Sequence, residues 1–410
     1  MKGLPDIRYT TRSDNPTRRP GRLGYGVRCP VFHAGGRRRS FLLITGAILI
    51  LSMLLAGCGP STAQLEAVDY TPLLGDDWPV STPEEQGLDP MLVAGLYHNA
   101  TEVETLKALL VVKNGHLIAE GYFHGGAPEG KDRIQSVTKS YTSALVGIAL
   151  EQGCLTSVDQ KMMEFFPELA DRITDPRKGQ ITIRQMLQMR AGYPWEESTA
   201  ELFELLYHGF RPSNLVDVPL VRDPGADFDY SNLTSHLVGV IVARACDTDL
   251  KSFAQEHLFA PLGVEVGDWI TDWEGNYNGH GDLHFTARDM AKFGLLYLNE
   301  GAYQGDQIVS ADWVRDSLET YSDDAWDYRV GRNFKDIGYG YQWWSVTAGE
   351  HHYNLAWGHG GQQIALVDEL DMVIVVKADP LFGQHGDAPW RHEKANLNLV
   401  ADFINSLPSE

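Results

Sequence analysis

A potential nucleophile and a potential base occur three residues apart in Ser136-Val137-Thr138-Lys139. A serine hydroxyl needs a neighbouring base to become a nucleophile, and residues three apart on a helix share one face. A lysine held in a dry pocket loses solvation, its pKa falls, and it can then accept the serine proton. Ser136 at the start of a helix can also lend its backbone N–H to an oxyanion hole. A capping serine followed by a surface lysine is the alternative reading of this tetrad.

A tyrosine and an asparagine that could assist such a pair follow in Tyr230-Ser231-Asn232. A tyrosine hydroxyl near a cationic lysine can ionise and shuttle protons, and an asparagine amide can orient the lysine and a substrate carbonyl. The same pattern occurs in Tyr97-His98-Asn99, but that copy precedes Ser136 and falls on the first expected helix. We therefore favour Tyr230 and Asn232, with an ordinary turn before a helix as the alternative.

A glycine pair lies between a histidine and an apolar strand in His359-Gly360-Gly361, which leads into Gln362 to Val367. Glycines let a substrate lie against a strand edge, and a strand N–H can complete an oxyanion hole. The triplet recurs in His124-Gly125-Gly126, but that copy precedes Ser136 and leads into a polar loop. Order along the chain and the strand context favour His359.

The elements that must position these residues can be read from the hydrophobic pattern. A helix should begin after Asp89-Pro90, and a β-hairpin should surround Asn114-Gly115. An apolar helix should follow Ser136 through Leu150, and residues 156–335 should be mostly helical. The carboxyl-terminal part should contain strands at 338–344, 354–358, 364–367 and 372–376 and a final helix at about 390–407. Strands at both chain ends predict an α/β (α+β) fold with one antiparallel sheet, flanking helices and an inserted helical region.

The amino terminus has the pattern of an export signal. Three arginines, Arg37 to Arg39, precede an apolar stretch from Phe41 to Ala56, which is short for a membrane span. The stretch ends in Leu55-Ala56-Gly57-Cys58, which resembles a bacterial lipobox, whose cysteine receives a diacylglyceryl group. Arg38-Arg39 also resembles a twin-arginine signal, although arginines that merely flank the apolar stretch are the alternative, so export by the Sec or the twin-arginine route stays open. An uncleaved single-span anchor is the alternative to the signal peptide.

These patterns predict three parts of the chain. Residues 1–57 would be an extension and lipoprotein signal peptide, residues 58–79 a tether, and residues 80–407 the catalytic domain. We expect an exported protein that is lipid-anchored at Cys58, on the periplasmic or extracellular face of the cell envelope.

Charge and cysteine content exclude several classes of function. The formal net charge of -21 repels phosphate backbones, so we expect no nucleic-acid partner. The acidity fits either a soluble surface or a patch that attracts a cationic ligand. Four cysteines form no Cys-x-x-Cys pair, so neither a zinc site nor a disulfide scaffold is expected. Cys154 and Cys246 are interpreted as buried small hydrophobes rather than as a bridge.

Together the three motifs resemble the serine β-lactamase-like hydrolase family, with the order Ser-x-x-Lys, Tyr-x-Asn and Lys/His-x-Gly. Members include class C β-lactamases, D-Ala-D-Ala carboxypeptidases, EstB-type esterases and nylon-oligomer hydrolases. The resemblance covers about residues 80–405. It includes Ile181 to Leu187 running to Ala191-Gly192-Tyr193, and the helix signature from Phe285 to Gly294.

The resemblance implies a β-lactamase/penicillin-binding-protein-like fold and a role for each motif residue. Ser136 would be acylated and Lys139 would take its proton. Tyr230 would protonate the leaving group and later activate the deacylating water, and Asn232 would hold the geometry. The backbone N–H groups of Ser136 and Gln362 would form the oxyanion hole, and no metal or organic cofactor is expected.

The departures from the family pattern bear on the substrate. His359-Gly360-Gly361 stands where β-lactamases and carboxypeptidases usually have Lys-Thr-Gly, and we expect His359 to be largely neutral near pH 7. This weakens the prediction for β-lactams, which carry a carboxylate, and favours an esterase or amidase. Met189-Arg190 replaces the His-Thr of many relatives.

The predicted function is therefore hydrolysis of a small-molecule ester or amide, or of a peptide, through an acyl-enzyme on Ser136. A D-alanyl-D-alanine carboxypeptidase, a β-lactamase and an acylated sensor module without turnover stay open as alternatives. The oligomeric state also stays open.

Overall fold

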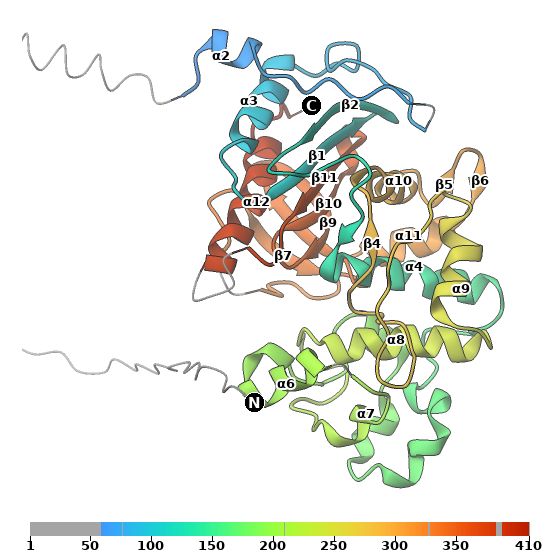
Figure 1. The fold of residues 1–410 in the computed structure, drawn as a ribbon. Coiled ribbons are helices and arrows are strands. Elements are labelled where there is room, and N and C mark those ends of the chain that lie inside the picture. The colour runs from blue at the N-terminus through green and yellow to red at the C-terminus, as the bar shows by residue number, and fades with distance from the viewer. Residues whose placement is uncertain (1–58, 76, 209, 327–328, 383–387, 410) are drawn as a thin grey trace, which may run out of the picture. The chain divides into compact units, whose positions relative to one another are not determined.

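A seven-stranded antiparallel sheet dominates the computed structural model, which describes residues 59–75, 77–208, 210–326, 329–382 and 388–409 (Figure 1). Its strands are β1 (Leu106–Lys113), β2 (His116–Tyr122), β7 (Lys335–Tyr339), β8 (Trp344–Ala348), β9 (His351–Gly358), β10 (Gln362–Val367) and β11 (Met372–Ala378). They lie in the order β2-β1-β11-β10-β9-β8-β7, and every neighbouring pair is antiparallel. The predicted sheet made from both chain ends is confirmed.

Alternation along the central strands gives the sheet two buried faces. In β1, Leu109 and Val111 belong to one hydrophobic core, whereas Leu110 and Val112 belong to the other. Because successive side chains of a strand point to opposite faces, a nearly continuous apolar run is what a sheet covered on both sides requires. The site must therefore lie at an end of the strands.

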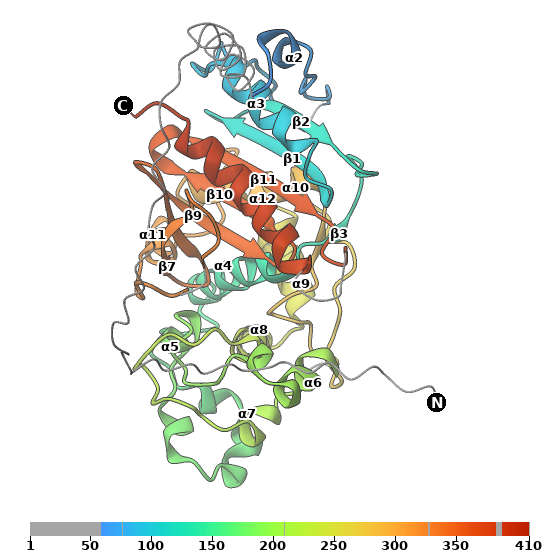
Figure 2. The same ribbon diagram turned by 90° about the vertical axis from the view of Figure 1, so that its left-hand side faces the viewer.

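Helices cover both faces of the sheet (Figure 2). One face is covered by α3 (Pro90–Ala100) and α12 (Ala388–Asn405), which share a core with it. As predicted, α3 begins after Asp89, whose side chain accepts a hydrogen bond from the backbone N–H of Met91 at 2.8 Å. The opposite face is covered by α10 (Ala287–Leu298), with α4 (Thr138–Glu151) and α11 (Ala311–Leu318) beside it.

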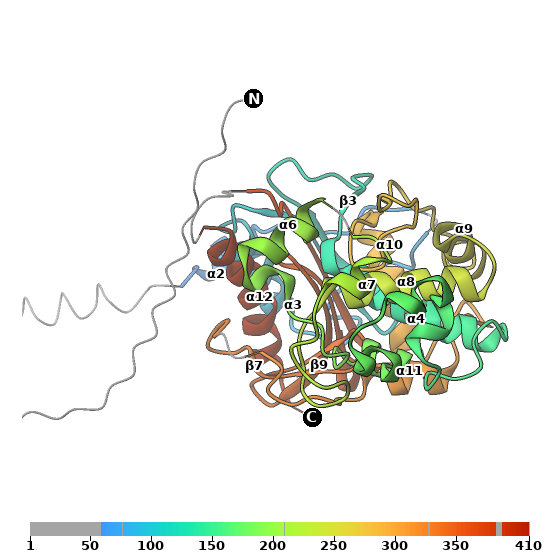
Figure 3. The same ribbon diagram turned by 90° about the horizontal axis from the view of Figure 1, so that it is seen from below.

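The regular elements of the inserted region between β2 and β7 are mainly helices, as predicted, and α8 (Asn232–Ala245) packs against α4 (Figure 3). The other helices here are α5 (Ile183–Leu187), α6 (Ala200–His208), α7 (Asn214–Asp217) and α9 (Leu250–Ala254), with short turns η1 (Gln135–Val137), η2 (Met162–Phe165), η3 (Pro167–Arg172), η4 (Pro176–Gln180), η5 (Glu196–Ser198) and η6 (Gln255–Phe259). Short strands pair as β3 (Asp132–Arg133) with β4 (His284–Phe285) and as β5 (Ala302–Tyr303) with β6 (Asp306–Gln307). A last turn, η7 (Asp368–Leu370), joins β10 to β11.

One predicted strand is wrong, because the structure divides it into two strands joined by a turn. The stretch 338–344 was expected to be a single strand, but β7 ends at Tyr339 and β8 begins at Trp344. Between them Gln342 has a φ of 61°, which no strand tolerates. The backbone carbonyl of this buried residue accepts a hydrogen bond from the Ser140 hydroxyl at 2.8 Å. The aromatic run here is therefore explained by burial in a turn, which hydropathy alone does not distinguish from a strand.

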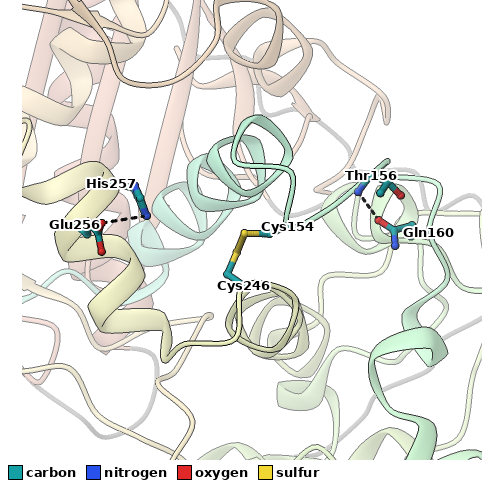
Figure 4. Close-up of a disulfide and its surroundings, with 6 residues drawn as sticks. All are labelled: Cys154, Thr156, Gln160, Cys246, Glu256 and His257. Atoms are coloured by element: carbon teal, nitrogen blue, oxygen red, sulfur yellow. Dashed lines mark hydrogen bonds and ion pairs between the residues drawn. A yellow bond between two sulfur atoms is a disulfide. The ribbon is translucent and has the colours of Figure 1, made fainter.

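The interpretation of Cys154 and Cys246 as unpaired hydrophobes is wrong, because they form a disulfide (Figure 4). Cys154 follows the end of α4, and Cys246 caps the end of α8. The packing of these two helices brings the Cα atoms to 4.9 Å, a distance that suits a bridge. The two cysteines are 92 residues apart in the chain, so no local sequence pattern indicates that they form a disulfide.

Part of the segment 58–79, which was expected to be a tether, contacts the domain. After a short helix, α2 (Thr62–Glu66), the carbonyl of Tyr70 accepts a hydrogen bond from the backbone N–H of Glu120 at 2.9 Å. The N–H of Leu73 donates to the Glu120 carboxylate at 2.8 Å. The described residues from Pro60 onward form one compact unit.

The predicted signal peptide and the lipobox with Cys58 lie outside the described residues. Within the described part of the chain, no helix has the length and apolar character needed to cross a membrane.

Candidate active site

Ser136 lies in a tight turn that precedes a buried helix. The 3₁₀ turn η1 contains Ser136, and α4 begins two residues later at Thr138. Gln135 has a φ of 52°, a left-handed conformation that costs a non-glycine residue free energy and is common beside functional groups. The turn directs the backbone so that Ser136 and Lys139 meet, although Ser136 is not itself part of the α-helix.

Lys139 is the centre of the site. Its side chain is buried, with the residue only 1% exposed, and its Nζ has three oxygen neighbours. These are the Ser136 Oγ at 2.9 Å, the Asn232 Oδ1 at 2.8 Å and the His280 carbonyl at 2.9 Å. Burial lowers the pKa of Lys139 to about 7, although the charges of Glu196, Glu197 and Asp282 act in the opposite direction.

The three neighbours of Lys139 determine which way the serine proton points. A neutral amine has two N–H groups and one lone pair, and a carbonyl or amide oxygen can only accept. When Lys139 is neutral, its two N–H groups donate hydrogen bonds to the Asn232 Oδ1 and the His280 carbonyl. Its lone pair is then left for the Ser136 hydroxyl, which is the geometry of a general base.

Tyr230 completes this group from the loop before α8. The Lys139 Nζ lies 4.8 Å from the centre of its ring, which stacks on Trp344 at 5.7 Å. Burial raises the pKa of Tyr230, and a hydrogen-bonding interaction with Ser136 opposes that rise only in part. Burial therefore favours the neutral phenol of Tyr230, which can donate a proton.

The first turn of α8 is held by a buried carboxylate that the sequence analysis missed. Glu196 is 0% exposed and accepts hydrogen bonds from the Ser231 hydroxyl at 2.8 Å and from the backbone N–H groups of Asn232 at 2.8 Å and Leu233 at 3.0 Å. These N–H groups are the free donors at a helix start. Glu196 is 36 residues from Asn232, so no local pattern indicated its role.

Met189 and Arg190 position the loop that leads to Tyr230. The N–H of Ser231 donates to the Met189 Sδ at 3.4 Å, and the Arg190 guanidinium donates to the carbonyls of Gly225 at 2.7 Å and Ala226 at 2.8 Å. The departure from the family pattern at these positions therefore acts on the loop between α7 and α8.

The glycines after His359 are required by their backbone and surroundings. Gly360 and Gly361 have φ values of 83° and 87°. A Cβ on Gly360 would lie 2.6 Å from the Pro380 Cα, and one on Gly361 would lie 2.5 Å from the Asn396 Cβ. Any other residue would be strained and would clash, so the turn from β9 to β10 needs both glycines.

The same turn brings the start of β10 close to the turn that contains Ser136. A Cβ on Gly358 would lie 3.0 Å from the Ser136 backbone nitrogen, so β9 touches the nucleophile turn directly. Gln362 pairs with Gly358 across the two strands. Its side chain is engaged with Ala378, to whose carbonyl the Nε2 donates at 2.6 Å. The arrangement brings the backbone of Gln362 near that of Ser136, as an oxyanion hole requires.

The structure gives His359 an acidic partner that the sequence did not indicate. Its Nδ1 lies 3.0 Å from the Glu393 carboxylate, which also accepts hydrogen bonds from the Trp357 Nε1 at 2.8 Å and the Gly360 N–H at 3.0 Å. Burial lowers the pKa of His359, but the bond to Glu393 and the charges of Glu393 and Glu197 outweigh it and raise the pKa. Glu393 lies on the final helix, and nothing in the sequence marked it.

The rejected copies of two motifs have other environments. Tyr97 is buried in α3 and donates to the Leu109 carbonyl at 2.7 Å. The carbonyl of His124 accepts from Lys107 at 2.7 Å, at the end of the β1–β2 hairpin. Among the described residues, no three candidate metal ligands form a group.

Comparison with known proteins places this site in a family. A family model described as Beta-lactamase matches residues 100–382. The chain belongs to the beta-lactamase family of serine hydrolases. A 6-aminohexanoate-dimer hydrolase of Paenarthrobacter ureafaciens is 28% identical over 284 residues, which are 65% of this chain and 71% of that protein. Beta-lactamase-like protein 2 of Dictyostelium discoideum is 25% identical over 197 residues, 41% of this chain but only 36% of that protein.

Solved structures of other proteins share the fold of this chain. EstCE1, a hydrolase with promiscuous acyltransferase activity, has a TM-score of 0.58 at 16% identity, covering 74% of this chain and 97% of that one. The octameric penicillin-binding protein homologue from Pyrococcus abyssi has a TM-score of 0.56 at 20% identity, covering 76% and 77%.

Proposed function

We propose that this protein hydrolyses esters or amides through an acyl-enzyme on Ser136. The observation that carries the proposal is the buried Lys139 Nζ, which contacts both the Ser136 Oγ and the Asn232 Oδ1. A lysine whose pKa is about 7 is a base near neutral pH, and a base at this distance can take the serine proton.

The reaction then has two half-reactions. Ser136 transfers its proton to Lys139 while its Oγ attacks the carbonyl carbon, and the backbone N–H groups of Ser136 and Gln362 stabilise the oxyanion. The neutral Tyr230 phenol donates its proton to the leaving group and regains one from Lys139. A water then attacks the ester carbon of the acyl-enzyme and gives its proton to this lysine–tyrosine pair, and Ser136 leaves as the restored hydroxyl.

The charges beside the site favour a neutral substrate over one with a carboxylate. Apart from Lys139, His359 is the residue of the three motifs that can carry a positive charge, but Glu393 lies 3.0 Å from it and the charge of Glu197 also acts on it. One imidazolium against two carboxylates leaves little net attraction for an anion. This supports an esterase or amidase above a β-lactamase or a D-alanyl-D-alanine carboxypeptidase. The names of the relatives, a 6-aminohexanoate-dimer hydrolase and the hydrolase EstCE1, agree with that choice.

The role of His359 predicts how substrate preference changes with pH. We expect the ratio of kcat/KM for a carboxylate-bearing ester to that for its neutral analogue to fall as pH rises through the raised pKa of His359, above 6.5, because the imidazolium loses its charge. His359→Lys should keep the ratio at its acid value or above across pH 6 to 9. The change in ratio should be on the order of fivefold to tenfold. Using a ratio cancels the titration of Lys139, which affects both substrates.

His359→Gln is the matched control for this experiment, since it has no charge at any pH. Its ratio should be low and independent of pH. A wild-type ratio that does not change with pH, together with unchanged ratios in both variants, would show that His359 does not face the substrate. Wild-type kcat/KM values higher for a cephalosporin than for the neutral ester would contradict the esterase/amidase assignment itself.

We also propose that the protein is exported and lipid-anchored through Cys58. The Leu55-Ala56-Gly57-Cys58 motif supports the anchor. The disulfide between Cys154 and Cys246 supports export, because such bridges persist in oxidising compartments.

Metabolic labelling tests the anchor. Cells that express the wild-type protein in the presence of radioactive palmitate should yield a labelled protein that lacks residues 1–57, and Cys58→Ala should remove the label. Cys154→Ala is the control, because it alters a cysteine outside the motif and should leave the label in place. Equal labelling of the wild type and Cys58→Ala would contradict lipidation at Cys58.

A further inference from the structure

Glu196 is a buried acidic residue that none of the catalytic steps uses. It lies in η5, and its carboxylate meets the start of α8. One oxygen accepts from the Ser231 hydroxyl and the Leu233 N–H, and the other accepts from the Asn232 N–H. Burying a carboxylate costs free energy unless it is paired or fully hydrogen-bonded. The buried position of Glu196 therefore suggests a role for its carboxylate at this turn.

The contacts of Glu196 connect it to the catalytic lysine through one residue. The backbone N–H of Asn232 donates to Glu196 at 2.8 Å, and the side chain of the same residue accepts from Lys139 at 2.8 Å. The side chain of Ser231 already caps α8 by accepting from the Thr234 N–H at 3.1 Å. An ordinary cap is therefore present, and Glu196 adds a second set of bonds to the turn that bears Asn232.

We propose that Glu196 is a positioning residue of the active site. Its carboxylate fixes the first turn of α8, and with it the amide that Lys139 contacts, and it places a negative charge beside the lysine. This inference rests on the proposed role of Lys139 as the base for Ser136.

The charge of Glu196 acts in a defined direction on Lys139. Burial lowers the pKa of Lys139, and among the charges that oppose this effect Glu196 is the largest, followed by Glu197 and Asp282. The other titratable groups around the lysine are Tyr230, whose ring faces it, and His280, whose pKa is lowered by burial and by the lysine charge.

Glu196 must be ionised for this role, and its bonds fit that state. Burial raises the pKa of Glu196, but its bonds to Leu233, Asn232 and Ser231 act against the rise. Both oxygens accept from backbone N–H groups, which can only donate, and this matches a carboxylate rather than a carboxylic acid. Removing the charge should therefore lower the pKa of Lys139 further.

The test measures how fast a fluorophosphonate labels Ser136 at pH 5 to 9, which reports activation of the nucleophile whatever the natural substrate is. The labelling rate should rise with pH to a plateau, and the acid limb of this pH profile reports the pKa of Lys139. In Glu196→Gln the acid limb should move to lower pH by about one unit, because the lysine becomes neutral more readily. The plateau rate should fall about tenfold, since the new NH₂ group opposes one backbone N–H. Glu196→Asp keeps the charge but is shorter, so its limb should stay near that of the wild type while its plateau falls.

Asp249→Asn is the matched control. Asp249 caps α9 by accepting from the Ser252 N–H at 2.9 Å and is not among the charges that act on Lys139. This variant should keep the wild-type limb and plateau.

The outcomes separate this inference from the proposed function. Wild-type protein that is not labelled at Ser136 would overturn the proposed function. Labelled wild type with an unshifted limb in folded Glu196→Gln would overturn the electrostatic part of this inference alone. If Glu196→Gln does not fold, Glu196→Asp decides, because a plateau equal to that of the wild type would show that the position of the carboxylate does not matter.

Discussion

Ser136→Ala and Lys139→Met should each lower kcat/KM for a p-nitrophenyl ester by a factor on the order of 10⁴ or more. The first variant removes the atom that forms the acyl bond. The second removes the base that lies 2.9 Å from it, and methionine fills the buried space that an alanine would leave empty. Because the two residues take part in one proton transfer, kcat/KM of the double variant should be no lower than that of the less active single variant. Steady-state kinetics on the three proteins measures both effects.

Ser143→Ala is the matched control for the serine variant. Ser143 is buried in the same helix, and its hydroxyl has no hydrogen-bond partner among the described residues. Removing it should change kcat/KM by less than about threefold. Wild-type activity in Ser136→Ala, or multiplicative losses in the double variant, would contradict the nucleophile–base pair.

Loss of the disulfide should have the largest effect on stability. Cys154→Ala combined with Cys246→Ala should lower the free energy of unfolding by about 4 kcal/mol, because the bridge closes a loop of 92 residues and restricts the unfolded chain. The bridge also joins the far ends of α4 and α8, whose first turns carry Lys139 and Asn232. Urea unfolding with a spectroscopic probe gives this free energy.

Reduced wild-type protein is the internal comparison for that measurement. It should unfold at the same urea concentration as the double variant, whereas the oxidised protein should unfold at a higher one. Free thiols at Cys154 and Cys246 in the oxidised wild type, or identical unfolding with and without reductant, would show that the bridge does not form.

The residues that meet at Lys139 could be predicted because their spacing is local in the sequence. Ser136 and Lys139 are one helical turn apart, and Tyr230 and Asn232 are two residues apart, so each pair is nearly fixed by its own backbone. The sheet was predictable for a similar reason, since apolar runs and the Asn114-Gly115 turn indicate strands and hairpins without reference to the rest of the chain.

What the sequence did not show depends on contacts between distant segments. Glu196 meets Asn232 across 36 residues, Glu393 meets Trp357 across 36, and Cys154 meets Cys246 across 92. A glutamate in a loop or on an amphipathic helix is ordinary until packing buries it. The acidic partner of His359 could not be predicted for the same reason, because Glu393 belongs to the last helix, α12.

The central claim is that Ser136 carries a transient acyl group, and peptide mass spectrometry of protein quenched during turnover tests it most directly. The protein is mixed with excess p-nitrophenyl acetate, quenched in acid at intervals and digested with a protease. We expect one acetyl adduct on the peptide that contains Ser136 while substrate remains, and loss of that adduct within seconds to minutes after the substrate is consumed. Hydrolysis without any adduct at Ser136, or with an adduct on another residue that turns over at the catalytic rate, would contradict the mechanism. An adduct at Ser136 that persists after the substrate is gone would identify an acylated sensor rather than a hydrolase.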